Sequence, residues 1–239
     1  MNTPLFVTFA AAAAFISSSA LAQLPTASPG APSIPADSPI GGSKQSIGAT
    51  TQPVAAPATG SQPSEEEMMR LMMENMKLNE NHKLLAELVG DWTYTVKMWM
   101  DPSAPPLESK GTMTRRSEMD GRYFVGDASG KFPMPGPDGK MQDFNFKGRS
   151  TEAYDNAKKK FVSSWIDNMG TGIMLSEGTY DPSTKTFTYH ANYDMAPGVQ
   201  TKIRETIKVT DKDHHLMEWF EDRGGKEVKT MEIAYTRKK

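Results

Sequence analysis

The stretch HKLLAELVGDWTYTV, residues 82–96, contains the point at which the pattern of apolar residues changes from helical to extended. Before Gly90 the leucines recur at spacings that place them on one face of a helix. They are Leu84, Leu85 and Leu88. Over residues 91–96 polar and apolar residues alternate, which is the period of a strand with one buried face. The stretch therefore predicts a short helix, ended by Gly90 as its C-cap, that leads directly into a β-strand.

The alternating pattern continues to the end of the chain. Turn-forming residues, such as the prolines of DPSAPP and the glycines of DRGGK, separate one apolar run from the next. The predicted strands are 92–100, 109–119, 122–131, 143–154, 160–167, 171–180, 186–194, 200–210, 214–222 and 226–237. Short connections favour antiparallel neighbours, and this many strands tend to curl and close. We predict an all-β fold, a closed antiparallel barrel of about ten strands preceded by an α-helical segment.

Four segments follow one another along the chain. Residues 1–22 are an apolar run that ends in the small-x-small sequence Ala20-Leu21-Ala22, which predicts a cleaved signal peptide and a periplasmic or secreted protein. The alternative is an uncleaved membrane anchor. Residues 23–63 are rich in Pro, Ala, Ser and Gly and predict a disordered linker. A helical lead-in at 64–90 and a barrel domain at 91–239 complete the chain.

Composition excludes several classes of function. The chain has 239 residues, a net charge of −2 and no cysteine. A chain without basic excess offers no electrostatic site for nucleic acid, and we expect none to bind. The lack of cysteine excludes disulfides and thiolate chemistry. After residue 22 no stretch is long and apolar enough for a membrane helix, so no stable membrane insertion is expected after signal cleavage.

Particular motifs add a family resemblance. HKLLAELVGDWTYTV, DGRYF, EAYDN, WIDNMGTG, EGTYD and the terminal YTRK resemble the bacterial domain-of-unknown-function family 1579, over roughly residues 80–239. The resemblance implies a calycin-like (lipocalin-type) barrel, in which Trp92 has a structural role, packed across the bottom of the barrel at the start of the first strand, and it implies no activity. A more distant resemblance, to nitrobindin-like barrels, implies a haem held by a histidine close to the C-terminus. The final predicted strand has no histidine, so we expect no cofactor.

The predicted inward faces carry charged residues among apolar ones. Arg115, Glu152 and Glu205 each share a strand face with apolar neighbours, so they would lie inside the barrel among Trp and Met side chains. Such groups can anchor a small ligand in an apolar pocket. The alternatives are a structural ion pair, or a register that turns these groups toward solvent.

The stretch WIDNMGTGIM, residues 165–174, presents Asp167 and Asn168 beside two glycines. Its composition predicts a hairpin turn rather than a catalytic loop, and it leaves Trp165 and Asp167 as candidates for contact with a ligand. The complete set of candidate ligand-binding residues is Arg115, Glu152, Trp165, Asp167, Glu205 and Trp99. We assign no catalytic residue, because no nucleophile–base, phosphate-loop or metalloprotease motif is present.

The histidines and methionines give weaker signals. His82 is predicted to cap its helix or hydrogen-bond to the barrel, and the DKDHH stretch, residues 211–215, is predicted to be a polar hairpin tip without metal. The 64–79 helix carries one methionine stripe: Met69, Met72, Met73 and Met76. The stripe can dock on the barrel or on a protein partner, and clustered thioethers can also bind Cu(I).

Three functions follow from these observations. The first is non-catalytic binding of a small apolar or amphipathic ligand in the barrel. The second is an envelope interaction module that docks through the Met-rich helix. The third is a hydrolase-type enzyme that uses buried carboxylates, and the missing motifs weigh against it.

Overall fold

A computed structural model describes residues 62–136 and 138–239. The predicted signal peptide, and all of the predicted linker but its last two residues, lie outside the described residues. Within the described part, no helix is both long and apolar enough to cross a lipid bilayer.

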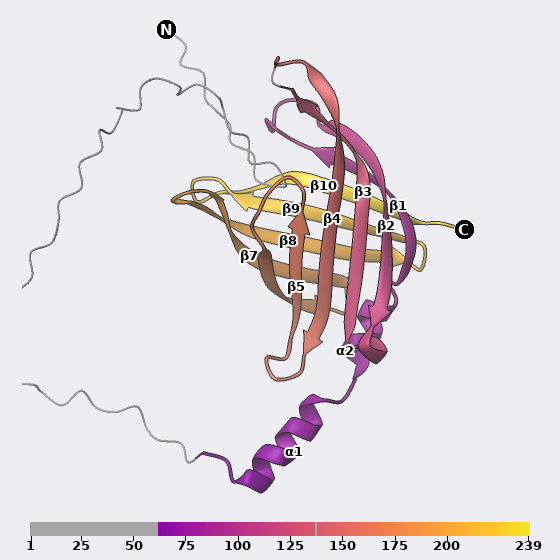
Figure 1. Cartoon of the computed structure of the whole chain (residues 1–239), viewed down its shortest axis with the longest axis vertical. Helices are drawn as coiled ribbons and strands as arrows, with labels where there is room; N and C mark the ends of the chain where they lie inside the picture. Colours follow the sequence, from indigo (N-terminus) through magenta and orange to yellow (C-terminus); the bar gives the residue numbers. More distant parts are fainter. Residues whose placement is uncertain (1–61, 137) are drawn as a thin grey trace, which may run out of the picture. The chain divides into compact units, whose positions relative to one another are not determined.

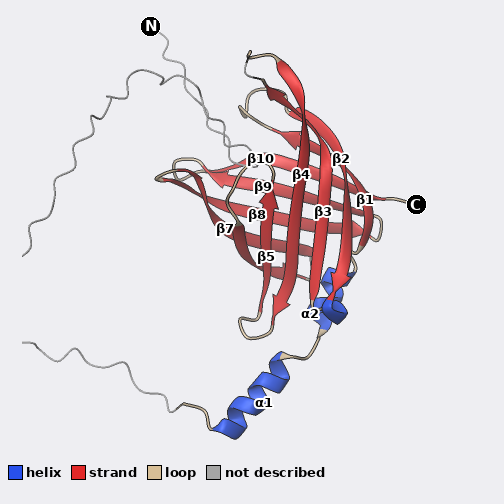
Figure 2. Ribbon diagram, in the orientation of Figure 1, coloured by secondary structure: helices blue, strands red, loops and turns tan. Residues whose placement is uncertain are grey.

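Ten antiparallel strands close into one barrel, which confirms the predicted fold class (Figures 1 and 2). Each strand pairs with its neighbours in sequence, and β1 pairs with β10 to close the ring. The strands are β1 Gly90–Met98, β2 Leu107–Glu118, β3 Tyr123–Pro135, β4 Met141–Asp155, β5 Lys160–Asp167, β6 Met174–Asp181, β7 Thr186–Ala196, β8 Val199–Asp211, β9 His214–Asp222 and β10 Glu227–Arg237. A single 3₁₀ turn, Met119–Gly121, joins β2 to β3.

Most strand boundaries differ from the predicted ones by a few residues, and two of the differences affect the ends of the barrel. The sixth strand begins at Met174 rather than at 171, because the residues after β5 form a wider turn. Gly90 is the first residue of β1 and not a helix cap, since helix α2 (Glu80–Ala86) ends four residues earlier. The helix is instead fixed at its start, where the imidazole Nδ1 of His82 accepts the Asn79 N–H at 3.2 Å in a capping box.

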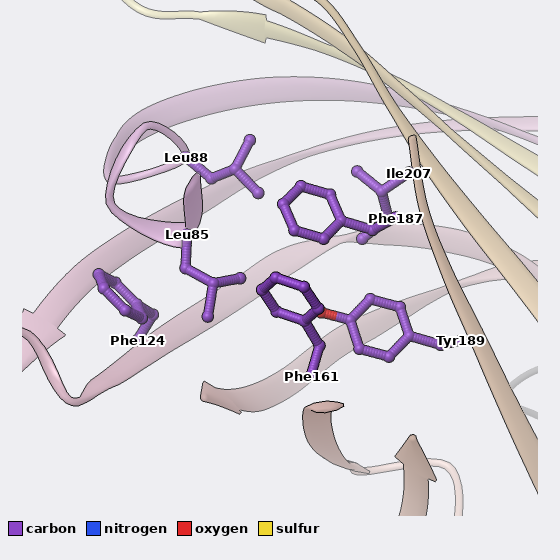
Figure 3. Close-up of a cluster of buried hydrophobic side chains, with 7 residues drawn as sticks. All are labelled: Leu85, Leu88, Phe124, Phe161, Phe187, Tyr189 and Ile207. Carbon is purple, nitrogen blue, oxygen red and sulfur yellow. The ribbon is translucent and has the colours of Figure 1, made fainter. Parts of the chain in front are cut away.

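Helix α2 closes one end of the barrel (Figure 3). Leu85 and Leu88 point into the barrel and are almost wholly buried. They pack in one apolar cluster with residues from four strands: Phe124, Phe161, Phe187, Tyr189 and Ile207. The leucine face predicted from the sequence thus fills this end of the barrel. A cavity that could bind a ligand has to lie toward the other end.

Trp92 fixes this closed end to the wall. Its side chain is buried, and its indole N–H donates to the carbonyl of Leu88 at 3.0 Å. The guanidinium of Arg237, from β10, lies 4.1 Å from the centre of the indole ring. These contacts join the helix to the first and last strands, which is the structural role that the sequence predicted for Trp92.

Helix α1 (Glu65–Asn75) has no buried residue. Its first turn is capped by the Ser64 hydroxyl, which accepts the Glu67 N–H at 3.2 Å. The four methionines of the predicted stripe, Met69, Met72, Met73 and Met76, are 56–61% exposed.

Candidate functional site

A cavity of about 150 Å³ lies inside the barrel, toward the end opposite α2. Residues of the turn between β5 and β6 line it, as do Lys110 at the start of β2 and Lys131 near the end of β3. Its walls are mostly apolar. The aromatic and methionine residues around it are Tyr94, Phe132, Phe146, Trp165, Tyr193, Trp219, Tyr235, Met98, Met113, Met169, Met174, Met217 and Met231. An apolar cavity of this size takes a molecule about as large as benzene.

Arg115 and Glu152 form a buried ion pair in this cavity. The closest guanidinium nitrogen and carboxylate oxygen are 3.2 Å apart, and both side chains are less than a tenth exposed. The hydroxyl of Ser150 donates to Glu152 at 3.4 Å. Both side chains therefore point into the barrel, as predicted. Their pairing matches one of the alternatives drawn from the sequence, a structural ion pair, while both residues also line the cavity.

Gly126 makes room for two side chains next to this pair. It lies on β3, between β2 and β4, and is opposite Arg115 on one side and Ser150 on the other. A Cβ atom at this position would lie 2.4 Å from the methyl carbon of Met113 and 2.7 Å from the Ser150 hydroxyl. A larger residue here would press on Met113 and on Ser150, whose hydroxyl donates to Glu152, whereas the Arg115 Cγ would be at an ordinary contact distance of 3.5 Å.

Glu205 projects into the same cavity from β8. Ile203 and Ile207, two residues away on either side, are buried on the same face. Burial of the Glu205 carboxyl, together with the nearby charge of Glu152, raises its pKa to about 7, and Arg115 opposes the rise. A carboxyl in this state can donate a hydrogen bond when protonated or pair with a cation when ionised.

Trp165 and Asp167 line the cavity near the turn that ends β5. The Trp165 indole N–H donates to one Asp167 oxygen at 2.8 Å. The other oxygen accepts the backbone N–H groups of Met169 and Gly170 at 2.9 and 3.2 Å. The hairpin turn predicted from WIDNMGTGIM is confirmed, and its aspartate ties an aromatic wall of the cavity to the turn.

Trp99, the remaining candidate from the sequence, is not among the residues that line the cavity. It follows the last residue of β1, where the inward alternation ends with Met98. The Lys229 ammonium lies 5.2 Å from the centre of its ring, so Trp99 contacts a neighbouring strand and not the interior.

Three interior residues were not among the candidates from the sequence. Tyr189 and Tyr235 are buried beside the charged groups, and burial raises the pKa of each phenol. His215 is also buried, although the sequence placed it in a polar hairpin tip. It stacks on Tyr235 with ring centres 4.3 Å apart, and its pKa is lowered to about 2 by burial. Its alternation with Met217 and Trp219 was the available signal.

The adjacent residue, His214, is exposed and lies in the polar hairpin tip that the sequence predicted. His214 hydrogen-bonds to Asp211 at 2.9 Å in the β8–β9 turn. Across the described residues, no three His, Asp or Glu side chains are grouped so that they could hold a metal ion.

The family prediction is confirmed by comparison with known proteins. The sequence model of a family described as "Protein of unknown function (DUF1579)" matches residues 77–237. No curated protein matches the chain.

Two solved structures resemble the chain at low identity. An S-type phycobiliprotein lyase from Guillardia theta is 14% identical, with 70% of this chain and 97% of the lyase covered and a TM-score of 0.45. A redesigned beta barrel is 11% identical, with 65% of this chain and 96% of the design covered and a TM-score of 0.32.

Proposed function

The chain belongs to DUF1579, a family of proteins of unknown function, and we propose that its barrel binds a small amphipathic ligand in the cavity beside Arg115, Glu152 and Glu205. One observation carries the proposal: an apolar cavity of about 150 Å³ contains an ionisable side chain, Glu205, whose one cationic neighbour, Arg115, is already paired with Glu152. A solid core would need no such group, because a buried carboxyl without a partner costs folding free energy.

The shape of the cavity supports an amphipathic ligand in particular. Its aromatic and methionine walls favour an apolar body, and methionine adapts to irregular shapes. The charged groups remote from the mouth, Arg115, Glu152 and Glu205, lie near one another, since the first two both act on the pKa of Glu205, so one polar head group can reach them. Arg115 and Glu152 already satisfy each other in part, which leaves Glu205 as the main point of recognition.

Titration of the full chain with benzyl alcohol, followed by calorimetry and by tryptophan fluorescence, tests the proposal. Two neighbouring serines on β5 provide matched variants. Ser163 lines the cavity, whereas the next residue, Ser164, does not. Ser163→Phe should fill the cavity and abolish binding, while Ser164→Phe should bind as the unaltered chain does. Equal binding by both variants, with both folded by circular dichroism, would place the ligand elsewhere and contradict the proposal.

The other two hypotheses from the sequence stay predictions. The methionines of α1 are exposed, as an interaction surface requires, and deletion of residues 64–79 should then abolish partner capture without unfolding the barrel. Glu152 and Glu205 both face the interior, as a carboxylate enzyme requires. Export rests on the sequence of residues 1–22, and N-terminal sequencing of the mature protein would test it.

A further inference from the structure

The charges inside the barrel do not balance. Among the residues that line the cavity, the acidic and basic side chains remote from the mouth are one guanidinium, Arg115, and two carboxyls, Glu152 and Glu205. The two lysines in the lining, Lys110 and Lys131, are exposed, and the Lys131 ammonium is 3.2 Å from Asp143 outside the cavity. Arg115 is taken up by Glu152, so an ionised Glu205 is a surplus negative charge.

Glu205 has no partner among residues 62–136 and 138–239, since none of their side chains or backbone groups forms a hydrogen bond or ion pair with its carboxyl. Its neighbours across the ladder are Tyr189 on β7 and Trp219 on β9. The ionisable groups that face it are Arg115 from β2, Glu152 from β4, Tyr189 from β7 and Tyr235 from β10. Only the first of these is a cation.

The sign of the missing charge decides the class of ligand. An anionic head group would meet two carboxyls. Two of the three guanidinium nitrogens of Arg115 already face Glu152, which leaves only its buried Nε–H without a partner in the described part of the chain. A cationic head group would meet Glu205 directly and would also be attracted by Glu152. Aromatic faces in the same cavity, such as Trp165 and Trp219, favour a cation as well.

We propose that the ligand of this cavity is a small amphipathic amine, whose ammonium group pairs with Glu205 while its apolar part packs against the aromatic and methionine walls. The inference rests on the proposed function and narrows it to a chemical class. It agrees with the raised pKa of Glu205, because the ionised carboxyl lacks a counter-charge that an arriving ammonium group would supply, with release of the bound proton.

Three probes of nearly equal size test the sign of the charge: benzylamine, which is protonated at neutral pH, benzyl alcohol and benzoate. Calorimetry with the full chain should give the highest affinity for benzylamine, about tenfold above benzyl alcohol, since a hydrogen bond to a charged partner is stronger than one between neutral groups. Benzoate should bind most weakly. If benzyl alcohol or benzoate binds as tightly as benzylamine, the inference is wrong while the proposed function stands. If none of the three binds, both are wrong.

Glu205→Gln tests whether Glu205 causes the preference for benzylamine, because glutamine keeps the shape of the side chain and removes its charge. In this variant the affinity for benzylamine should fall about tenfold, and the affinity for benzyl alcohol should stay within about twofold. Glu108→Gln, on an exposed position of β2, is the matched control and should change neither affinity. Thermal unfolding confirms that both variants fold. An amine preference that survives Glu205→Gln would overturn the assignment.

Proton release gives a second, independent measure. Titration with benzylamine at pH 7 in two buffers of different ionisation enthalpy should show about half a proton released per site, because a carboxyl with a pKa of about 7 is half protonated at that pH. Benzyl alcohol should release none, and Glu205→Gln should release none with either probe. Binding of benzylamine without proton release in the unaltered chain would contradict an ammonium–Glu205 pair.

Discussion

Trp165 donates its indole N–H to Asp167 at 2.8 Å, and both residues lie at the end of β5 beside the cavity. The bond joins a wall of the cavity to a turn, because the second oxygen of Asp167 holds the backbone of Met169 and Gly170. Asp167 thus has two roles: it stabilises the turn, and it orients the ring of Trp165 at the cavity wall.

Asp167→Ala should therefore weaken binding more than it weakens folding. Loss of these hydrogen bonds should cost about 1–2 kcal/mol of unfolding free energy, since the site is only partly buried. The freed indole should shift its fluorescence, and benzyl alcohol should bind several-fold more weakly. Asp138→Ala is the control, because Asp138 caps another hairpin turn by accepting the Lys140 N–H and does not line the cavity. Equal loss of binding in both variants would show that Asp167 has no special role.

Gly148 positions the same indole from the neighbouring strand. It lies on β4, opposite Asp167, and a Cβ atom there would be 2.4 Å from the Trp165 ring. Gly148→Ala should push the ring into the cavity, with a cost of about 1–3 kcal/mol and a loss of binding. Gly172 also lines the cavity but has nothing within 4 Å of an added Cβ. Gly172→Ala should thus bind normally, and chemical denaturation with ligand titration compares the two variants.

The Arg115–Glu152 pair should behave differently when one member or both are removed. Arg115→Met leaves Glu152 buried without a cation and should cost about 3–5 kcal/mol of unfolding free energy. Arg115→Met combined with Glu152→Met replaces the pair by apolar side chains and should restore most of that loss. Urea denaturation of the two single variants and the double variant gives the coupling. A double variant as unstable as the sum of the single ones would show that the residues do not act as a pair.

The sequence predicted the barrel well, because local patterns determine its strands and their antiparallel order. Ten alternating runs with short connections leave few alternatives to a closed meander. The inward faces of Arg115, Glu152 and Glu205 followed from the same alternation. The ion pair was only one of the alternatives, because Arg115 and Glu152 lie on β2 and β4, which are separated by β3, and local alternation gives no distance between them. Trp99 was wrongly included among the candidates, since the alternation along β1, with Met98 as its last buried residue, puts the next residue on the outer face.

His215 was missed for a different reason, since it was assigned to a polar hairpin tip although its alternation with Met217 and Trp219 put it on the inward face of β9. It lies between Tyr235, at 4.3 Å, and Trp92, at 4.4 Å between ring centres, and neither ring nitrogen has a hydrogen-bond partner in the described part of the chain. An imidazole in such a place is an aromatic packing residue. His215→Phe should therefore fold with unchanged or higher stability at neutral pH.

The pH dependence of stability should expose His215 and Glu205 as opposing groups. The folded pKa of His215, about 2, is below its ordinary value of 6.5, so the unfolded chain alone binds this proton and stability falls as the pH drops below 6.5. The folded pKa of Glu205, about 7, is above its ordinary value of 4.5, so stability falls as the pH rises from 4.5 to 7. Between about pH 5 and 6 the two effects oppose each other, each with a slope approaching about 1.4 kcal/mol per pH unit.

Removal of one group should then reveal the other. His215→Phe should lose stability as the pH rises from about 5 to 6, and Glu205→Gln should gain stability over the same range, each measured against the unaltered chain by urea denaturation. His190→Phe, at an exposed position of β7, is the control for the histidine and should leave the profile unchanged. The double variant should return to a profile close to that of the unaltered chain. If stability changes with pH in the same direction in both single variants, at least one of the two groups does not have the shifted pKa that its burial would cause.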